Sequence, residues 1–184
     1  IKDQKQLRDE WTAHHEQYFE KFDALLDGAS TGPRWLGEPA IAEIVAEAIR
    51  YRDGKSYDLI AYCIMPNHVH VVCVVGRPDW SPNNGGDTGR RDSSTNTGPV
   101  GRGNSSSYSL THILENLKWY TALKCNKVLG RTGAFWQHES YDHVIRTGDE
   151  LEHTIWYVLY NPVRAGLVDS WEEWKWTYCK PDIL

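Results

Sequence analysis

The chain contains 184 residues, of which 40% are hydrophobic and 24% are charged, which is the size and balance of one globular domain with a buried core. Its 20 Lys and Arg residues against 25 Asp and Glu residues give a formal net charge of −5. At first sight this charge argues against a nucleic-acid-binding protein, because phosphate contacts need a basic surface. No apolar run approaches the roughly 20 residues of a membrane span. The four cysteines are widely spaced and form no C-x-x-C pair, so we expect no disulfide scaffold and a reduced, cytoplasmic setting.

The charge is unevenly distributed along the chain. Residues 1–58 have a net charge of −4, residues 59–147 of +3, and residues 148–184 of −4. A basic middle between acidic flanks can form a local basic groove, so nucleic acid is not excluded as a partner.

The first part of the chain predicts two helices followed by two strands. Charged and aromatic residues over 5–27 have a loosely helical spacing, and an amphipathic helix then begins near Pro39 and is stopped by Gly54. Residues 57–64 and 68–75 are rich in apolar and β-branched residues, as strands are. The short break between them indicates an antiparallel pair.

Residues 76–109 differ from the rest of the chain in composition. They hold many of the glycines and serines and few large apolar side chains. We expect a flexible surface insertion within a single domain that spans residues 1–184.

The second part of the chain predicts two more helices, over residues 110–127 and over residues 149–160, the latter ended by Pro162. Short extended segments or strands are expected at 135–136 and 144–145, and a tail that packs back on the body holds Trp171, Trp174 and Trp176. This order favours an α+β fold, an antiparallel sheet with helices packed against it, over a doubly wound sheet.

His68 and His70 are the sharpest chemical feature of the sequence. Residues two apart in a strand point to the same face, so both imidazoles should project side by side while Val69 packs on the other face. Two such imidazoles are a ready pair of metal ligands, although partly exposed strand histidines are the commoner explanation of a bare H-x-H. Here the pair lies in the longer string M-P-N-H-V-H, between two apolar segments.

Tyr157 and Asn161 form a second candidate pair, since residues four apart share one face of a helix. A tyrosine hydroxyl can act as a nucleophile, and an asparagine carbonyl oxygen can complete a metal's ligand set. Taken alone, the pair is better explained as a core aromatic and a helix-ending residue before Pro162.

Three strings, in this order, carry a resemblance to a known family: M-P-N-H-V-H, F-W-Q-H-E-S-Y-D-H-V-I-R and Y-V-L-Y-N-P-V-R-A-G-L-V. Over about residues 38–75 and 110–178 the chain resembles the single-tyrosine HUH transposases, and in particular the REP-associated tyrosine transposases. The resemblance implies the α+β, ferredoxin-like fold of HUH nucleases.

The resemblance also implies roles for the two residue pairs. His68, His70 and Asn161 would bind a divalent cation, Mg²⁺ or Mn²⁺, and Tyr157 would be the nucleophile. The substrate would be single-stranded DNA beside a small hairpin, cut through a 5′-phosphotyrosine link that can later be reversed to join strands. The protein would act as a monomer or a homodimer. Histidine ligation by itself would also suit Zn²⁺ or other transition metals.

Other residues are weaker candidates. Tyr141 and Tyr160 compete with Tyr157 as the nucleophile, but Tyr160 has Arg164 rather than an amide four residues later. The base that takes the tyrosine proton is left open between a metal-bound water and His143.

Further side chains could support the site or the DNA. Asp142 or His143 could orient a metal ligand, and Trp119 and Tyr120 could stack on unpaired bases, although core packing is the commoner role of such aromatics. Basic residues that could contact phosphates, or equally form a solvated charged face, are Lys118, Lys124, Lys127, Arg131 and Arg146.

Two other functions remain open from the residues alone. A protein of the same fold could bind DNA hairpins with little catalysis, or a metal-dependent hydrolase could use bound water and leave Tyr157 structural. The complete set of two histidines, a tyrosine and an asparagine favours strand transfer, because an enzyme that had lost its activity would tend to lose one of the four.

Overall fold

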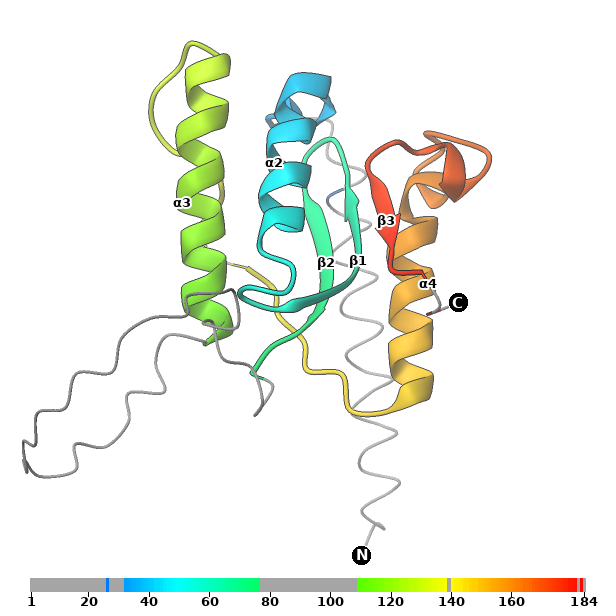
Figure 1. Cartoon of the computed structure of the whole chain (residues 1–184). Helices are drawn as coiled ribbons and strands as arrows, with labels where there is room; N and C mark the ends of the chain where they lie inside the picture. The colour runs from blue at the N-terminus through cyan, green and yellow to red at the C-terminus, as the bar shows by residue number, and fades with distance from the viewer. Residues whose placement is uncertain (1–25, 27–31, 77–108, 139, 182, 184) are drawn as a thin grey trace, which may run out of the picture.

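A three-stranded antiparallel sheet with helices on both faces forms the body of the protein, which confirms the α+β fold (Figure 1). The computed structural model describes residue 26 and residues 32–76, 109–138, 140–181 and 183. The elements in chain order are η1 (Trp35–Gly37), α2 (Pro39–Tyr51), β1 (Asp58–Ile64), β2 (Val69–Val74), α3 (Leu110–Val128), α4 (Gly148–Arg164), η3 (Trp171–Glu173) and β3 (Thr177–Cys179). The helix expected over 5–27 and the insertion expected over 76–109 fall almost wholly outside the described residues.

The central strand β1 pairs antiparallel with β2 on one side and with β3 on the other. Because successive side chains in a strand point to opposite faces, β1 contributes to two separate cores. Tyr62 and Ile64 pack into the cluster that holds α2 and α3, whereas Ala61 and Cys63 pack into the cluster that holds α4. The predicted pairing of the two strands is confirmed.

The helices form three layers around this sheet (Figure 1). α2 covers one face, α3 packs on the outer side of α2, and α4 covers the opposite face. The buried residues of α3 recur every four positions: Ile113, Leu117, Thr121 and Cys125. Within the described part of the chain, no helix has the length and apolar character needed to cross a membrane.

The expectation that Pro162 ends the last helix is wrong, because α4 continues through it to Arg164. Proline lacks only its own backbone N–H donor, and backbone hydrogen bonds of later residues close the turn that follows it. Gly166 N donates to Val163 O at 2.9 Å and Leu167 N donates to Pro162 O at 2.9 Å, with Gly166 at φ +68°. This is the Schellman ending of a helix, and it keeps Asn161 inside the helix, one turn after Tyr157.

The C-terminal tail packs back on the body, as expected. Trp176 is buried in the core between the sheet and α2, and Trp174 Nε1 donates to Ile64 O at 3.0 Å. The tail also contains β3, a strand that was not predicted. In contrast, the segments at 135–136 and 144–145 form no strand. All four cysteines are free thiols, as their spacing predicts.

Candidate active site

The two histidines of the M-P-N-H-V-H string lie on the sheet face that α4 covers. His70 is paired with Cys63 across the sheet, and both side chains point toward α4. His68 lies directly before β2, and its ring centroid is 4.8 Å from that of His70, with the two planes at 84°. The two imidazoles are therefore side by side, as the alternation of side chains in an extended segment predicts.

Asn67 orients the ring of His68. Its Nδ2 donates to Leu26 O at 2.7 Å, so its Oδ1 is the atom that lies 2.9 Å from Nδ1 of His68. An amide oxygen can only accept, so Nδ1 of His68 carries the proton and Nε2 carries the lone pair. Metal-binding imidazoles are commonly oriented through their second ring nitrogen in this way. The sequence predicts Asp142 or His143 for such a role, and Asn67, the direct neighbour of His68, is not among the predicted residues.

Helix α4 brings Tyr157 and Asn161 to the same place. The Asn161 side chain is 1% exposed, and its Nδ2 lies 3.2 Å from Nε2 of His70. The ring of Tyr157 lies 6.3 Å from the ring of His70, edge to face. Ile155, Val158 and Leu159 bury the neighbouring positions of α4 against the sheet, and this packing fixes the side of the helix that faces the histidines.

The donor atoms of this cluster fit a divalent cation. Nε2 of His68 and Oδ1 of Asn161 are buried atoms that make no hydrogen bond. The same two side chains are held through other atoms, His68 through Nδ1 by Asn67 and Asn161 through Nδ2 by His70. An imidazole nitrogen and an amide oxygen are ligands that divalent cations accept, and His70, whose Nε2 accepts a hydrogen bond from Nδ2 of Asn161, lies directly beside them. Among the described residues, no group of three or more His, Cys, Asp or Glu side chains is placed to hold a metal, so the candidate set depends on the Asn161 amide.

The structure distinguishes Tyr157 from the nearby Tyr160. Tyr160 is 45% exposed and its ring packs beside Trp156, with 5.6 Å between the centroids, on the outer side of α4. Tyr157 is half-buried and faces His70. Its ring also carries a cation, because the guanidinium carbon of Arg164 lies 4.5 Å from the ring centroid. Arg164 is not among the predicted site residues, although the seven-residue spacing from Tyr157 puts both on one helix face.

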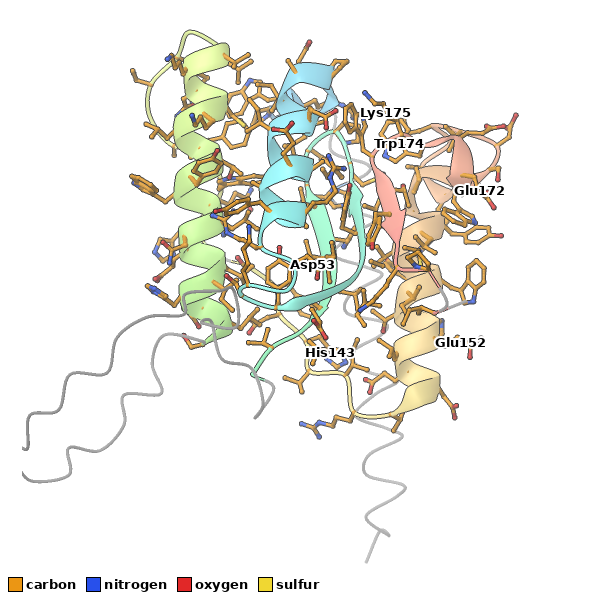
Figure 2. All side chains as sticks on the ribbon, in the orientation of Figure 1. Asp53, His143, Glu152, Glu172, Trp174 and Lys175 are labelled. Atoms are coloured by element: carbon orange, nitrogen blue, oxygen red, sulfur yellow. The ribbon has the colours of Figure 1, made fainter. Side chains whose placement is uncertain are left out.

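His143 lies in the segment before α4 (Figure 2), and its Nε2 is 2.7 Å from Oε1 of Glu150 in the first turn of that helix. Burial disfavours the charge of Glu150, but hydrogen bonds from the Arg146 backbone N–H and from His143 outweigh this effect and lower the pKa of Glu150. Glu150 precedes Tyr157 by seven residues, so the pair of His143 and Glu150 lies about 10 Å along the helix axis from Tyr157. Asp142 is exposed. A role of Asp142 or His143 in orienting a metal ligand stays a prediction.

The five basic residues predicted to contact DNA have different surroundings. Lys118 Nζ donates to Gln137 O at 2.9 Å and to His138 O at 3.3 Å, and burial lowers the pKa of its ammonium group. The Arg131 guanidinium donates to Asn126 Oδ1 at 2.7 Å and stacks on the ring of Trp35 at 3.9 Å. These two side chains therefore hold the loop after α3.

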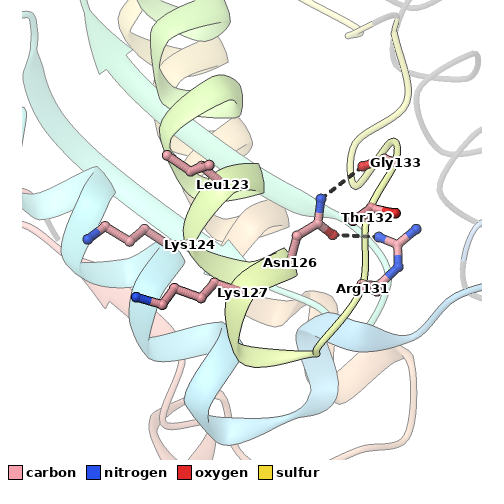
Figure 3. A pocket seen from close by; sticks show the side chains of 7 residues that line it. All are labelled: Leu123, Lys124, Asn126, Lys127, Arg131, Thr132 and Gly133. Carbon is pink, nitrogen blue, oxygen red and sulfur yellow. Dashed lines mark hydrogen bonds between the residues drawn. The ribbon is translucent and has the colours of Figure 1, made fainter.

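The other three basic residues are exposed. Lys124 and Lys127 line a surface hollow of about 610 Å³ at the end of α3, and their side chains point away from the loop that holds Arg131 (Figure 3). Arg146 precedes α4. DNA contact by the five basic residues stays a prediction.

A comparison with known proteins points to one class, the transposases, which are DNA-processing enzymes. A curated protein of Haemophilus influenzae named "Putative REP-associated tyrosine transposase" is 23% identical to the chain over 128 residues. The match covers 69% of this chain and 61% of the relative, so the chain spans less than two thirds of the relative's length. No family model matches the chain, and no solved structure matches it significantly. The resemblance to REP-associated tyrosine transposases is supported by this relative.

Proposed function

We propose that the protein is a metal-dependent enzyme that cuts and rejoins single-stranded DNA through Tyr157, beside hairpin-forming repeats, in the manner of a transposase. One observation carries the proposal: His68, His70, Tyr157 and Asn161 converge from two segments about 90 residues apart in the chain. The name of the Haemophilus influenzae relative supports the choice of DNA as the substrate.

The four side chains have complementary tasks in this reaction. A divalent cation held by the two histidines and Asn161 would neutralise and polarise a phosphodiester. The ring of Tyr157 lies 6.3 Å from that of His70 on a helix packed against the sheet, and this packing would limit the freedom that the hydroxyl loses when it attacks phosphorus. The ordinary pKa of a tyrosine hydroxyl is about 10, so the hydroxyl must lose its proton during the attack.

The chemical step conserves the energy of the phosphodiester bond. Oη of Tyr157 bonds to phosphorus and its proton passes to solvent, while the bond from phosphorus to the 3′ oxygen breaks and that oxygen takes up a proton. The products are a 5′-phosphotyrosine and a 3′-hydroxyl. A second 3′-hydroxyl can attack the phosphotyrosine in the reverse sense, which joins two strands and frees Tyr157.

A labelled single-stranded hairpin oligonucleotide tests the proposal. Incubation with Mn²⁺ or Mg²⁺ and separation on a denaturing gel should give a covalent protein–DNA band that Tyr157→Phe lacks. Tyr160→Phe is the matched control, because it removes a hydroxyl from the same helix three residues away, and it should keep the band. Cleavage without a covalent band would support a hydrolase instead, and binding without cleavage under both metals would support a DNA-hairpin-binding protein.

A further inference from the structure

A guanidinium group lies directly on the proposed nucleophile. Arg164 is in the last turn of α4, is exposed, and its Cζ is 4.5 Å from the ring centroid of Tyr157. Seven residues correspond to almost two full helical turns, and side chains on a helix lean toward its N-terminus, so Arg164 reaches back over Tyr157.

The surroundings of Arg164 leave its charge available to a ligand. Among the residues that the structure describes, no carboxylate forms an ion pair with this guanidinium. Arg131, which also stacks on an aromatic ring, differs because it donates hydrogen bonds to Asn126 and Ala134. Arg164 therefore combines an aromatic contact on one side with exposure on the other.

We propose that Arg164 binds the phosphate that Tyr157 attacks and holds that phosphate again in the 5′-phosphotyrosine. This assignment rests on the proposed function of Tyr157. Arginine suits the task because its planar fork of N–H donors matches two phosphate oxygens. The charge on those oxygens must be stabilised while phosphorus carries both the attacking and the leaving oxygen.

The arrangement would give a bound phosphate two cationic partners. His68, His70 and Asn161 lie on the side of Tyr157 that faces the sheet, and Arg164 lies toward the C-terminal end of α4. A cation held by these three side chains and the guanidinium of Arg164 would then both neutralise the phosphate that Tyr157 attacks. This second contact also offsets the acidic character of the chain, whose formal net charge is −5.

Two substitutions separate phosphate binding from a purely structural contact with the ring. Arg164→Lys keeps a positive charge above Tyr157 but loses the planar set of N–H donors. Arg164→Gln loses both the charge and the planar set of donors. Lys55→Gln is the matched control, because Lys55 is an exposed cation 3.3 Å above the ring of Tyr51, outside the candidate site. The single-turnover rate of covalent band formation should fall about 100-fold in Arg164→Gln and about 10-fold in Arg164→Lys, and should stay within about twofold in Lys55→Gln. Equal rates in wild type and Arg164→Gln would overturn the assignment.

A binding measurement keeps the test independent of cleavage. In a Tyr157→Phe background, which forms no covalent link, the slope of log affinity for single-stranded DNA against log salt should decrease by about 0.7 on Arg164→Gln, as for the loss of one phosphate contact. Lys55→Gln should leave the slope unchanged. If wild type forms no covalent band, the proposed function fails while a changed slope still supports phosphate binding by Arg164. An unchanged slope, an equal change in Lys55→Gln, or no DNA binding at all would overturn the assignment.

Discussion

The side-chain amide of Asn161 lies 3.2 Å from Nε2 of His70, although 91 residues separate the two in the sequence. The contact joins the last turn of α4 to β2 through the buried interior. It is possible because α4 continues past Pro162 and because His70 faces the helix side of the sheet. The contact brings together two of the three residues of the proposed metal site.

Replacement of Asn161 should separate metal binding from packing. Asn161→Asp keeps an oxygen donor and adds a charge, so we expect Mn²⁺ affinity equal to that of wild type or higher. Asn161→Leu has similar volume but no donor, and should lower Mn²⁺ affinity at least about tenfold. Isothermal titration calorimetry measures both, with Tyr157→Phe as a control that should bind Mn²⁺ as wild type does. Unchanged Mn²⁺ affinity in Asn161→Leu would exclude Asn161 as a ligand.

Formation of the covalent band should depend on the divalent cation that is supplied. A chelator should abolish the covalent band, because the cation would supply the charge that neutralises the phosphate from the sheet side. Mn²⁺ should restore the band at lower concentration than Mg²⁺, because two imidazole ligands suit Mn²⁺ better than the smaller, oxygen-preferring Mg²⁺. A titration of each metal against band intensity checks this order, and full activity in the presence of chelator would contradict the proposed metal site.

Lys118 should matter to stability. Its ammonium group bonds the carbonyls of Gln137 and His138, so Lys118→Met should lower the free energy of unfolding by about 1 kcal/mol. Denaturant unfolding measures the change, and Lys124→Met on the same helix should change it by less than about 0.5 kcal/mol. Equal stabilities of the two variants would show that the Lys118 contacts contribute nothing.

The pair of His143 and Glu150 should give an acid-dependent part of the stability. The pKa of Glu150 is lowered from its ordinary value of 4.5 in the folded protein, so the stabilisation is present above that value and is lost as the pH falls through the folded pKa. Glu150→Gln should therefore be less stable than wild type at pH 6, and the difference should shrink below about pH 4.5. Urea unfolding at a series of pH values measures it, and a difference that grows toward low pH would contradict the lowered pKa.

The sequence predicts those parts of the fold that depend on local periodicity. The helix from Pro39 and the helix with Leu117 on its buried face have a regular spacing of apolar side chains, and the strands around Tyr62 and His70 are short runs of apolar and β-branched residues. β3 lacks such a signal, because three residues are too few to show alternation and their pairing with β1 comes from tertiary packing.

The candidate site was predictable only in part for a similar reason. The histidine pair and the spacing of Tyr157 and Asn161 follow from strand and helix geometry. The contribution of Asn67 depends on a backbone carbonyl, Leu26 O, that is distant in the sequence. The path of α4 past Pro162 depends on the turn at Gly166, whose positive φ closes the helix after the proline. Periodicity contains neither kind of information.

The most direct test of the central claim is to locate the DNA on the protein by mass spectrometry. After reaction with a hairpin oligonucleotide and nuclease trimming, tryptic digestion should yield the peptide of residues 147–164 with a nucleotide attached, and fragmentation should assign the nucleotide to Tyr157. The same peptide contains Tyr160, and the peptide of residues 132–146 contains Tyr141, so each competing nucleophile has its own signature. A nucleotide on Tyr157 is the predicted result. A nucleotide on Tyr160 or Tyr141, or cleaved DNA with every tyrosine unmodified, would contradict the account.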